Sequence, residues 1–249
     1  MSEKVKNMFG NISERYDLLN DVLSFGIHRL WRKKTVKLSS ANIGFNILDC
    51  AAGTGDLSIE FKNKVGKNGI VIATDFSNDM LAIAKQKFRE KDLDIQTKTE
   101  DVMNLSFPDN SFDISSIAFG IRNVDSPQKG IDEMARVVKS DGEVIVLEFG
   151  QPSGFFSHFY HYYSEKIIPF VGQLLVKNKS AYNYLHQTAS KFPCREEFVE
   201  IMNKTERFKS IKYYPLTFGI AYIYIGKVKW VWLQTNGILL QDPKRFLQA

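Results

Sequence analysis

Cysteine is scarce in this sequence, and long apolar runs are missing from it. The two cysteines, Cys50 and Cys194, lie far apart, which excludes a disulfide framework, and no Cys/His spacing typical of a metal site occurs. No apolar run reaches the roughly 18 residues that span a bilayer. Residues 1–6 carry no apolar segment of a secretory signal. We therefore expect a reduced, cytoplasmic protein that holds no metal ion.

Charge of one sign is not concentrated anywhere in the chain. The 33 lysines and arginines and the 28 aspartates and glutamates give a formal net charge of +5, spread over all 249 residues. Because a dense Lys/Arg stripe is missing, no nucleic-acid partner is expected. The mild basic excess suits attraction to anionic headgroups. We expect transient, peripheral contact with the inner face of the membrane.

Short apolar segments alternate with helical stretches from residue 45 onward. Five predicted strands cover residues 45–49, 69–74, 94–98, 112–119 and 143–149. Helical periodicity between them covers residues 57–65, 78–89 and 127–138. This alternation is typical of a doubly wound, Rossmann-like α/β sheet with mostly parallel strands. Two further strands, 208–214 and 218–227, joined by Pro215-Leu216-Thr217, predict a closing antiparallel hairpin and a seven-stranded sheet.

Helical segments flank and interrupt the predicted core at 45–150. Residues 1–40 are predicted to form N-terminal helices, broken at Ser24-Phe25-Gly26. A helical insertion is predicted at 151–205, ahead of the closing strands at 206–227. Its aromatic residues, from Phe155 to Tyr163, favour a lid over an acceptor site, with plain core as the alternative. We interpret residues 1–227 as one domain.

An acidic, glycine-containing segment follows the first predicted strand. It reads Asp49-Cys50-Ala51-Ala52-Gly53-Thr54-Gly55-Asp56. Gly53 and Gly55 permit a tight turn that lets the backbone approach a ligand at the carboxyl ends of the strands. The spacing is not G-x-G-x-x-G, which counts against a dinucleotide pyrophosphate site and so against an NAD-linked dehydrogenase.

Acidic residues also follow the next two predicted strands. Asp75 is placed to accept hydrogen bonds from both ribose hydroxyls of an adenosine, although dehydrogenases use the same device. Asp101 and the backbone of Val102 are placed to meet the adenine ring. Singly, a glycine turn is often only a turn, and Asp101 could be a helix cap. Together these residues indicate adenosine with a short tail that carries no pyrophosphate.

In this order, the motifs resemble those of class I S-adenosylmethionine-dependent methyltransferases. More narrowly, residues 5–227 resemble the C-methyltransferases of menaquinone and ubiquinone biosynthesis. The most specific stretches are Met8–Asp17, Asn20-Asp21, Ser24–Trp31, Ala52–Leu57, Phe119–Val124 and Leu147–Phe149, and Tyr182–Leu185 also fits. The resemblance implies S-adenosyl-L-methionine as methyl donor. It implies a polyprenyl quinol as acceptor: demethylmenaquinol, a methoxy-polyprenyl-benzoquinol, or both.

The resemblance also assigns cofactor contacts to residues of this chain. With the turn residues added, the candidate cofactor-binding residues are Asp49, Gly53, Thr54, Gly55, Asp75, Asp101 and Val102. A further family contact, a serine in some members, falls on Ala118. Alanine has no hydroxyl to donate, and in this respect the chain resembles the menaquinone branch more.

The candidate catalytic residues are Arg122, Asn123, His28 and Tyr16. C-methylation needs the donor and the ring carbon in line, and a phenolic proton must leave. Arg122 could stabilise a phenolate or orient a water, since a guanidinium is not itself a base. The alternative is that Arg122 pairs with Glu148 or Asp125 and braces its loop. His28 is alternatively a packed helix residue.

Other functions stay open at this point. A methyltransferase for another small lipophilic acceptor, such as a phenol or a sterol, would share the cofactor half. A nonenzymatic assembly protein with this fold would be expected to have lost the cofactor residues. Family chains usually end near Lys227, whereas residues 228–249 continue here. This extension could be an extra strand, a dimer element, a membrane-surface contact or an artefact, so a homodimer is one alternative.

Overall fold

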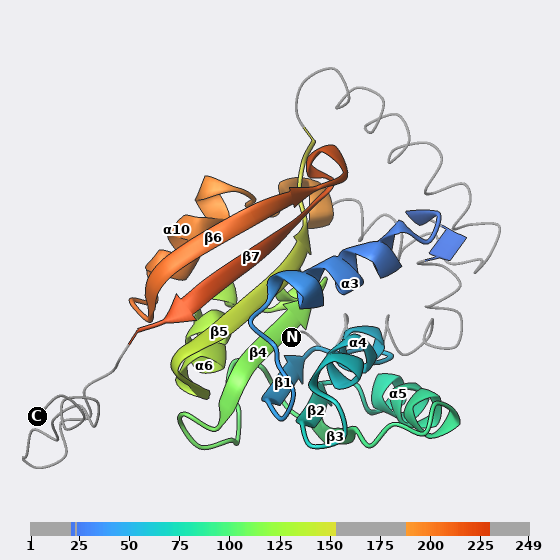
Figure 1. Ribbon diagram of the computed structural model, residues 1–249. Helices are drawn as coiled ribbons and strands as arrows, with labels where there is room; N and C mark the ends of the chain where they lie inside the picture. Colours follow the sequence, from blue (N-terminus) through green and yellow to red (C-terminus); the bar gives the residue numbers. More distant parts are fainter. Residues whose placement is uncertain (1–20, 23, 153–187, 230–249) are drawn as a thin grey trace, which may run out of the picture.

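A seven-stranded sheet forms the centre of the fold (Figure 1). The computed structural model describes residues 21–22, 24–152 and 188–229. The strands are β1 (Asn46–Cys50), β2 (Ile70–Asp75), β3 (Gln96–Thr99), β4 (Phe112–Ala118), β5 (Val138–Phe149), β6 (Phe208–Leu216) and β7 (Ala221–Val228). They lie in the order β3-β2-β1-β4-β5-β7-β6. The order reverses between β1 and β4, which creates the switch point where open α/β sheets bind ligands.

Strands β1 to β5 are parallel, and the hairpin of β6 and β7 closes the sheet antiparallel to β5. Asp49 on β1 lies opposite Ala73 on β2 and Ser116 on β4, so it sits at the middle of the parallel part. Ile47 and Leu48 are fully buried, as expected for a strand covered on both faces. These features confirm the predicted doubly wound sheet with its closing hairpin.

Helices cover both faces of the sheet. Figure 1 shows α3 (Ile27–Leu38), α4 (Asp56–Val65) and α5 (Asn78–Glu90) on one face, and α6 (Pro127–Arg136) and α10 (Glu196–Asn203) on the other. Each face has its own apolar core, one around Trp31 and Phe61 and the other around Met134 and Phe198. Helix α3 packs against α4 and reaches β5, so its side chains lie over the carboxyl end of β1.

Local signals in the sequence explain where these helices begin. The Ser77 hydroxyl accepts a hydrogen bond from Met80 N at 3.4 Å and caps α5. Ser126 caps α6 in the same way. The predicted break at residues 24–26 is confirmed, since Phe25 and Gly26 have φ of 50° and 72° and α3 begins at Ile27.

The predicted position of the closing turn is wrong. Pro215 and Leu216 still belong to β6, where they pair with Tyr222 and Ala221. The turn is instead the 3-10 helix η4 (Thr217–Gly219). Pro215 is tolerated because β6 is an edge strand, where a missing N–H can face away from the ladder. Other boundaries also shift: β5 begins at residue 138, β3 covers 96–99, and α6 ends at residue 136.

Several predicted features lie outside the described residues. They are the helices predicted within 1–20, most of the predicted lid (153–187) and most of the extension (230–249). Within the described ranges, no helix is long and apolar enough to cross a membrane. No group of three or more metal-ligating side chains occurs in that part of the chain.

Candidate functional site

The turn after β1 has a left-handed backbone at three positions. Ala51, Gly53 and Gly55 have φ of 46°, 57° and 82°. This conformation suits glycine but costs an alanine about 1 kcal/mol or more, a strain that clusters at functional sites. A Cβ on Gly55 would lie 2.4 Å from the Phe88 ring, whereas one on Gly53 would meet nothing within 4 Å. Gly55 is therefore required by close packing, and Gly53 faces open space.

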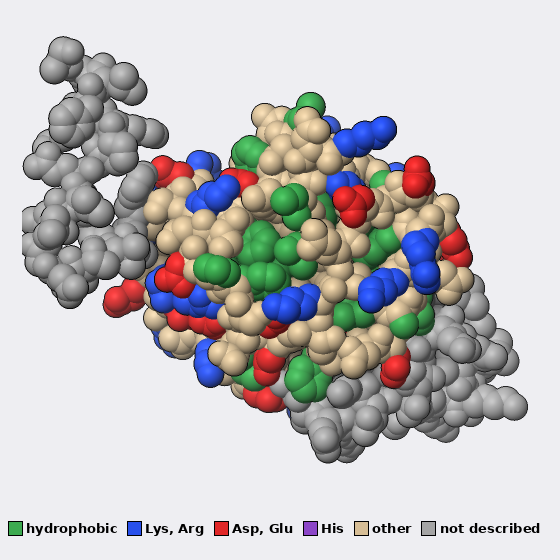
Figure 2. All heavy atoms as spheres, turned by 90° about the horizontal axis from the view of Figure 1, so that it is seen from below, with side chains coloured by type: hydrophobic (Ala, Val, Ile, Leu, Met, Phe, Trp, Pro, Cys, Tyr) green, Lys and Arg blue, Asp and Glu red, His purple; other side chains and the backbone are tan. Residues whose placement is uncertain are grey.

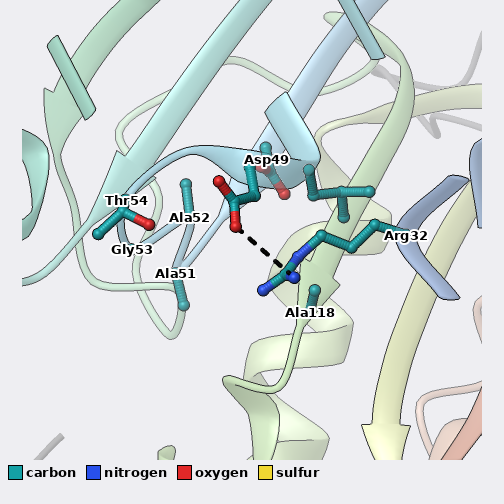
Figure 3. Close-up of a pocket in the computed structure, with 9 residues that line it drawn as sticks. Arg32, Asp49, Ala51, Ala52, Gly53, Thr54 and Ala118 are labelled. Carbon is teal, nitrogen blue, oxygen red and sulfur yellow. Dashed lines mark ion pairs between the residues drawn. The ribbon is translucent and has the colours of Figure 1, made fainter. Parts of the chain in front are cut away.

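A pocket opens beside this turn, at the carboxyl end of β1 (Figure 3). Its lining residues are Arg32, Asp49, Ala51, Ala52, Gly53, Thr54, Asp56, Leu57 and Ala118. The pocket thus brings together the predicted Asp49, Gly53 and Thr54 with Ala118 from β4. It also contains Arg32 and Asp56, which sequence reasoning missed as site residues.

Asp49 is a buried carboxyl that lines the pocket. Ser58 Oγ donates to its Oδ2 at 2.5 Å, and Ser116 Oγ donates to its Oδ1 at 2.8 Å. Burial raises the pKa of Asp49 to about 6, although the two serine hydroxyls and then the Arg32 guanidinium oppose the shift. A cation placed in the pocket would stabilise the ionised form. Arg32, which lines the same pocket, already acts in this direction, and Asp49 suits a further cationic group placed beside it.

Asp75 lies at the end of β2, next to the turn. Its Oδ2 accepts from Gly53 N at 2.9 Å, and its Oδ1 accepts from Ser77 N at 2.8 Å. Burial raises the pKa of Asp75, while these backbone N–H groups act in the opposite direction. The Asp75 carboxylate therefore ties the glycine turn of β1 to the start of α5.

Asp101 and Val102 follow the end of the neighbouring strand. Asp75 pairs with Thr99 on β3, and Asp101 comes two residues after that partner. The Asp101 Oδ1 accepts from Met103 N at 2.9 Å, an Asx turn rather than the helix cap considered from sequence. Val102 is buried. The predicted adenosine residues thus lie on two adjacent strand ends, outside the pocket lining.

Arg32 and Asp56 form a charged wall of the pocket. Arg32 Nη1 lies 3.6 Å from Asp56 Oδ2, the ion pair drawn dashed in Figure 3. Lys87 Nζ lies 2.5 Å from Asp56 Oδ1. Burial opposes ionisation of Asp56, but Arg32 and Lys87 outweigh it and keep its pKa below the ordinary value. The sequence signal was the spacing of Arg32 from His28, which places both on one face of a helix.

His28 is buried behind Arg32 rather than in the pocket lining. Its Nε2 lies 2.8 Å from Asp21 Oδ1, and Arg32 Nη1 donates to its Nδ1. Burial, and then the Arg32 guanidinium, lower the pKa of His28 below its ordinary value, so the imidazole is neutral at neutral pH. With Nδ1 as acceptor, the proton is on Nε2 and points to Asp21. This contact chain agrees with the packed-helix alternative for His28.

Arg122 forms a buried ion pair, as the bracing alternative proposed. Its Nη1 lies 2.8 Å from Glu148 Oε1 and also donates to the Phe119 carbonyl. The side chains of Arg122 and Glu148 are only 3% and 1% exposed. The guanidinium lies over the Phe149 ring, 5.1 Å from its centroid. Among the described residues, Arg122 Nε has no hydrogen-bond partner.

The loop that carries Arg122 packs directly on the pocket turn. A Cβ on Gly120 would lie 2.7 Å from the Ala51 Cβ, so this approach requires glycine at 120. Asn123 is buried in the 3-10 turn η2 (Ile121–Asn123), and its N–H donates to the Gly120 carbonyl at 3.0 Å. Tyr16 lies outside the described residues. The loop therefore packs against Ala51, which lines the pocket.

Comparison with known proteins identifies the family. Residues 1–228 match the model of the ubiE/COQ5 methyltransferase family. The chain belongs to this family. It is 50% identical over 228 residues to the ubiquinone/menaquinone biosynthesis C-methyltransferase UbiE of Bdellovibrio bacteriovorus, covering 91% of this chain and 97% of the relative. The UbiE of Francisella tularensis subsp. novicida is 38% identical and covers 90% of each chain. The predicted resemblance is confirmed.

Solved structures support the fold. A possible histamine N-methyltransferase from Thermotoga maritima aligns with a TM-score of 0.63 at 20% identity, covering 89% of this chain and 98% of that one. A phosphoethanolamine N-methyltransferase 2 from Haemonchus contortus, solved with S-adenosylhomocysteine, aligns with a TM-score of 0.61 at 17% identity, covering 85% and 56%. At these identities the similarity concerns the fold, which is that of S-adenosylmethionine-dependent methyltransferases.

Proposed function

We propose that this methyltransferase transfers a methyl group from S-adenosyl-L-methionine to a ring carbon of a polyprenyl quinol in respiratory quinone biosynthesis. The observation that carries the proposal is the acidic pocket at the carboxyl end of β1, in a chain of the ubiE/COQ5 family. Its relatives are named as C-methyltransferases of ubiquinone and menaquinone biosynthesis. No observation favours a phenol or a sterol as acceptor.

The chemistry of the described residues is compatible with S-adenosyl-L-methionine. Open space at Gly53 leaves room for a ligand against the backbone, and the buried Asp49 suits a cation. We propose that Asp75, at the end of β2, binds the ribose, as predicted from sequence. When bound, the donor supplies an electrophilic methyl group on a sulfonium. We propose that the residues predicted from sequence hold it, with Asp101 and Val102 toward the adenine.

The acceptor side is proposed to lie along Ala118 and the loop after β4. Ala118 lines the pocket and offers only a methyl group, which suits an apolar ring. We keep Arg122 as the candidate that stabilises a phenolate. Its Nε–H supports this role, because no described residue accepts a hydrogen bond from it. Its pair with Glu148 holds the guanidinium in place. Asn123, His28 and Tyr16 stay as predicted contributors to the acceptor side of the reaction.

Peripheral membrane contact from the cytoplasmic side is part of the proposal, because a polyprenyl quinol resides in lipid. Leu30 and Phe218 are 64% and 73% exposed. The Trp31 indole donates to Thr217 Oγ1 at 2.9 Å, so α3 and η4 adjoin. Lys33 is exposed one turn after Leu30, and apolar side chains beside a basic one suit a headgroup boundary.

Charge on the described surface is mixed. In Figure 2, lysine and arginine side chains are interspersed with aspartate and glutamate on the face shown. A nucleic-acid partner is still not expected. Whether two copies of the chain associate stays a prediction as well.

Calorimetric titration with S-adenosyl-L-methionine tests the donor half. We expect Asp75→Ala to weaken binding by about 10- to 100-fold, since hydrogen bonds to a charged group are lost. The matched control is Asp79→Ala, which removes the same charge from the exposed first turn of α5 and should leave the affinity unchanged. Unaltered binding in Asp75→Ala would exclude the proposed role of that carboxylate.

A methyl-transfer assay tests the acceptor half. Wild-type protein should methylate demethylmenaquinol, a methoxy-polyprenyl-benzoquinol, or both, presented in detergent or vesicles. The product should carry the new methyl group on a ring carbon, as nuclear magnetic resonance would show. Turnover of a phenol or a sterol with neither quinol methylated would overturn the proposed acceptor and leave the donor assignment standing.

A further inference from the structure

Arg32 reaches the pocket from an element that does not belong to the parallel core. In Figure 3 its side chain extends from α3 toward Asp49 and Ala118, which come from β1 and β4. The residue is 7% exposed. A buried guanidinium is costly unless its charge and its donors are paired. The partners that Arg32 has within the protein therefore show what is left for a ligand to supply.

Two contacts orient the Arg32 guanidinium, and a third holds the first of these partners in place. Nη1 donates to His28 Nδ1, and His28 is held in turn by Asp21 through Nε2. The guanidinium carbon lies 5.7 Å from the centroid of the Phe119 ring, within cation–π range. These contacts are to a neutral imidazole and an aromatic ring, so they orient the cation without neutralising it.

Asp49 and Asp56 both attract the Arg32 guanidinium, but neither accepts a hydrogen bond from it. Arg32 Nη1 lies 3.6 Å from Asp56 Oδ2, too far for a hydrogen bond, whereas Lys87 Nζ lies 2.5 Å from Asp56 Oδ1. One carboxylate is thus shared by two cations, and Lys87 holds it more closely. Within the described part of the chain, His28 is the one hydrogen-bond partner of Arg32. Most of its donors are therefore left for a ligand.

We propose that Arg32 binds the α-carboxylate of the methionine part of S-adenosyl-L-methionine. This assignment rests on the proposed donor. A guanidinium presents several donors in a planar fork that matches a carboxylate. The buried Asp49 is the complementary group for the positive charges of the same ligand. The pocket then separates the two signs of a zwitterion, with Arg32 facing the carboxylate and Asp49 facing the cationic part.

His28 is then a positioning residue for the donor rather than a catalytic one. It contacts Arg32 and not the pocket lining, and it transmits the anchorage at Asp21 to the guanidinium. This assignment gives the basic helix α3 a role at the donor site, beyond packing against α4.

Decarboxylated S-adenosylmethionine, which lacks only the carboxylate, separates this role from a structural one. Calorimetry should measure the dissociation constants of both ligands for wild type and for Arg32→Gln, Arg32→Lys and Lys34→Gln. Wild type should prefer the complete donor by about 10- to 100-fold, the range for a charged hydrogen-bonded contact. Arg32→Gln should abolish this preference by weakening only the complete donor, and Arg32→Lys should keep part of it. Lys34→Gln, which removes an exposed charge from the same helix, should match wild type.

The outcomes separate the role of Arg32 from the identity of the methyl donor. If wild type binds both ligands equally, the assignment is overturned, and this arm does not depend on how any variant folds. Equal weakening of both ligands in Arg32→Gln would also overturn it, because a structural role for Arg32 predicts that result. Failure of wild type to bind the complete donor would remove the proposed donor and this assignment together.

Discussion

The carboxyl edge of the sheet holds two buried carboxylates in contrasting surroundings. At the end of β1, Asp49 meets two serine hydroxyls and lines a pocket. At the end of β5, Glu148 meets Arg122 at 2.8 Å. The hydroxyls leave the charge of Asp49 without a cation at hydrogen-bonding distance among the described residues, whereas the charge of Glu148 is balanced within the protein. The contrast distinguishes a carboxylate placed for a cationic ligand from one that braces a loop.

The largest expected effect comes from breaking the buried ion pair of Glu148 at the end of β5. Glu148→Ala leaves the Arg122 guanidinium buried without its partner, and it also removes the acceptor of the Phe149 N–H. We expect the free energy of unfolding to fall by about 3–5 kcal/mol, as for other buried pairs that lose one member. Urea denaturation followed by circular dichroism measures this loss.

Two further variants show whether burial is the cause. Asp109→Ala breaks the pair with Arg136, in which Asp109 is 53% exposed, and should cost less than about 1 kcal/mol. The double variant Arg122→Met/Glu148→Leu removes both charges and should recover most of the stability lost in Glu148→Ala. If Glu148→Ala costs no more than Asp109→Ala, the ion pair is not the brace inferred here.

The sequence patterns predicted the sheet more fully than they predicted the site. Continuous apolar runs such as Ile47-Leu48 mark strands buried on both faces, and all seven predicted strands exist. The turn at Pro215 was misplaced, because an edge strand accepts a proline that would end an internal one.

Arg32 was missed for a tertiary reason. Its spacing from His28 places Arg32 on the same helix face as that candidate, but only the packing of α3 on α4 shows that this side chain lines the pocket. Asp49 and Asp75 were predictable, since strand ends meet at one edge of a parallel sheet whatever the details. For Arg122 the sequence predicted both its place and Glu148 as one of two alternative partners, and the adjacency of β4 and β5 brings about the pair with Glu148.

The role of Asp49, at the end of β1, can be tested by the pH dependence of ligand binding. Burial holds the pKa of Asp49 at about 6, so the free carboxyl is mostly protonated at pH 5 and mostly ionised at pH 7. A cationic ligand favours the ionised form, and binding should therefore release a proton at low pH. We expect the affinity for S-adenosyl-L-methionine to rise by about tenfold from pH 5 to pH 7, in line with the ionised fraction.

Calorimetry in buffers of different ionisation enthalpy measures this proton release directly. Asp75, whose pKa burial also raises, acts in the same direction. Asp49→Asn isolates Asp49, because it keeps an oxygen acceptor for a serine hydroxyl and removes the titration. A pH dependence of unchanged steepness in Asp49→Asn would show that Asp49 is not the group that titrates.

The smallest expected effects come from the two serine caps, Ser77 on α5 and Ser126 on α6. Ser77 and Ser126 each accept a hydrogen bond at 3.4 Å from the third N–H that follows. Either alanine variant should lower the free energy of unfolding by about 1 kcal/mol or somewhat less. Only Ser77 adjoins the Asp75 turn, since its N–H donates to that carboxylate. Ser77→Ala keeps this backbone N–H but loosens the start of α5 that carries it, so it should also weaken binding of S-adenosyl-L-methionine by about two- to fivefold, the effect of a few tenths of a kcal/mol up to 1 kcal/mol. Ser126→Ala should leave that affinity unchanged, and an equal loss in both variants would mean that helix stability alone controls the donor site.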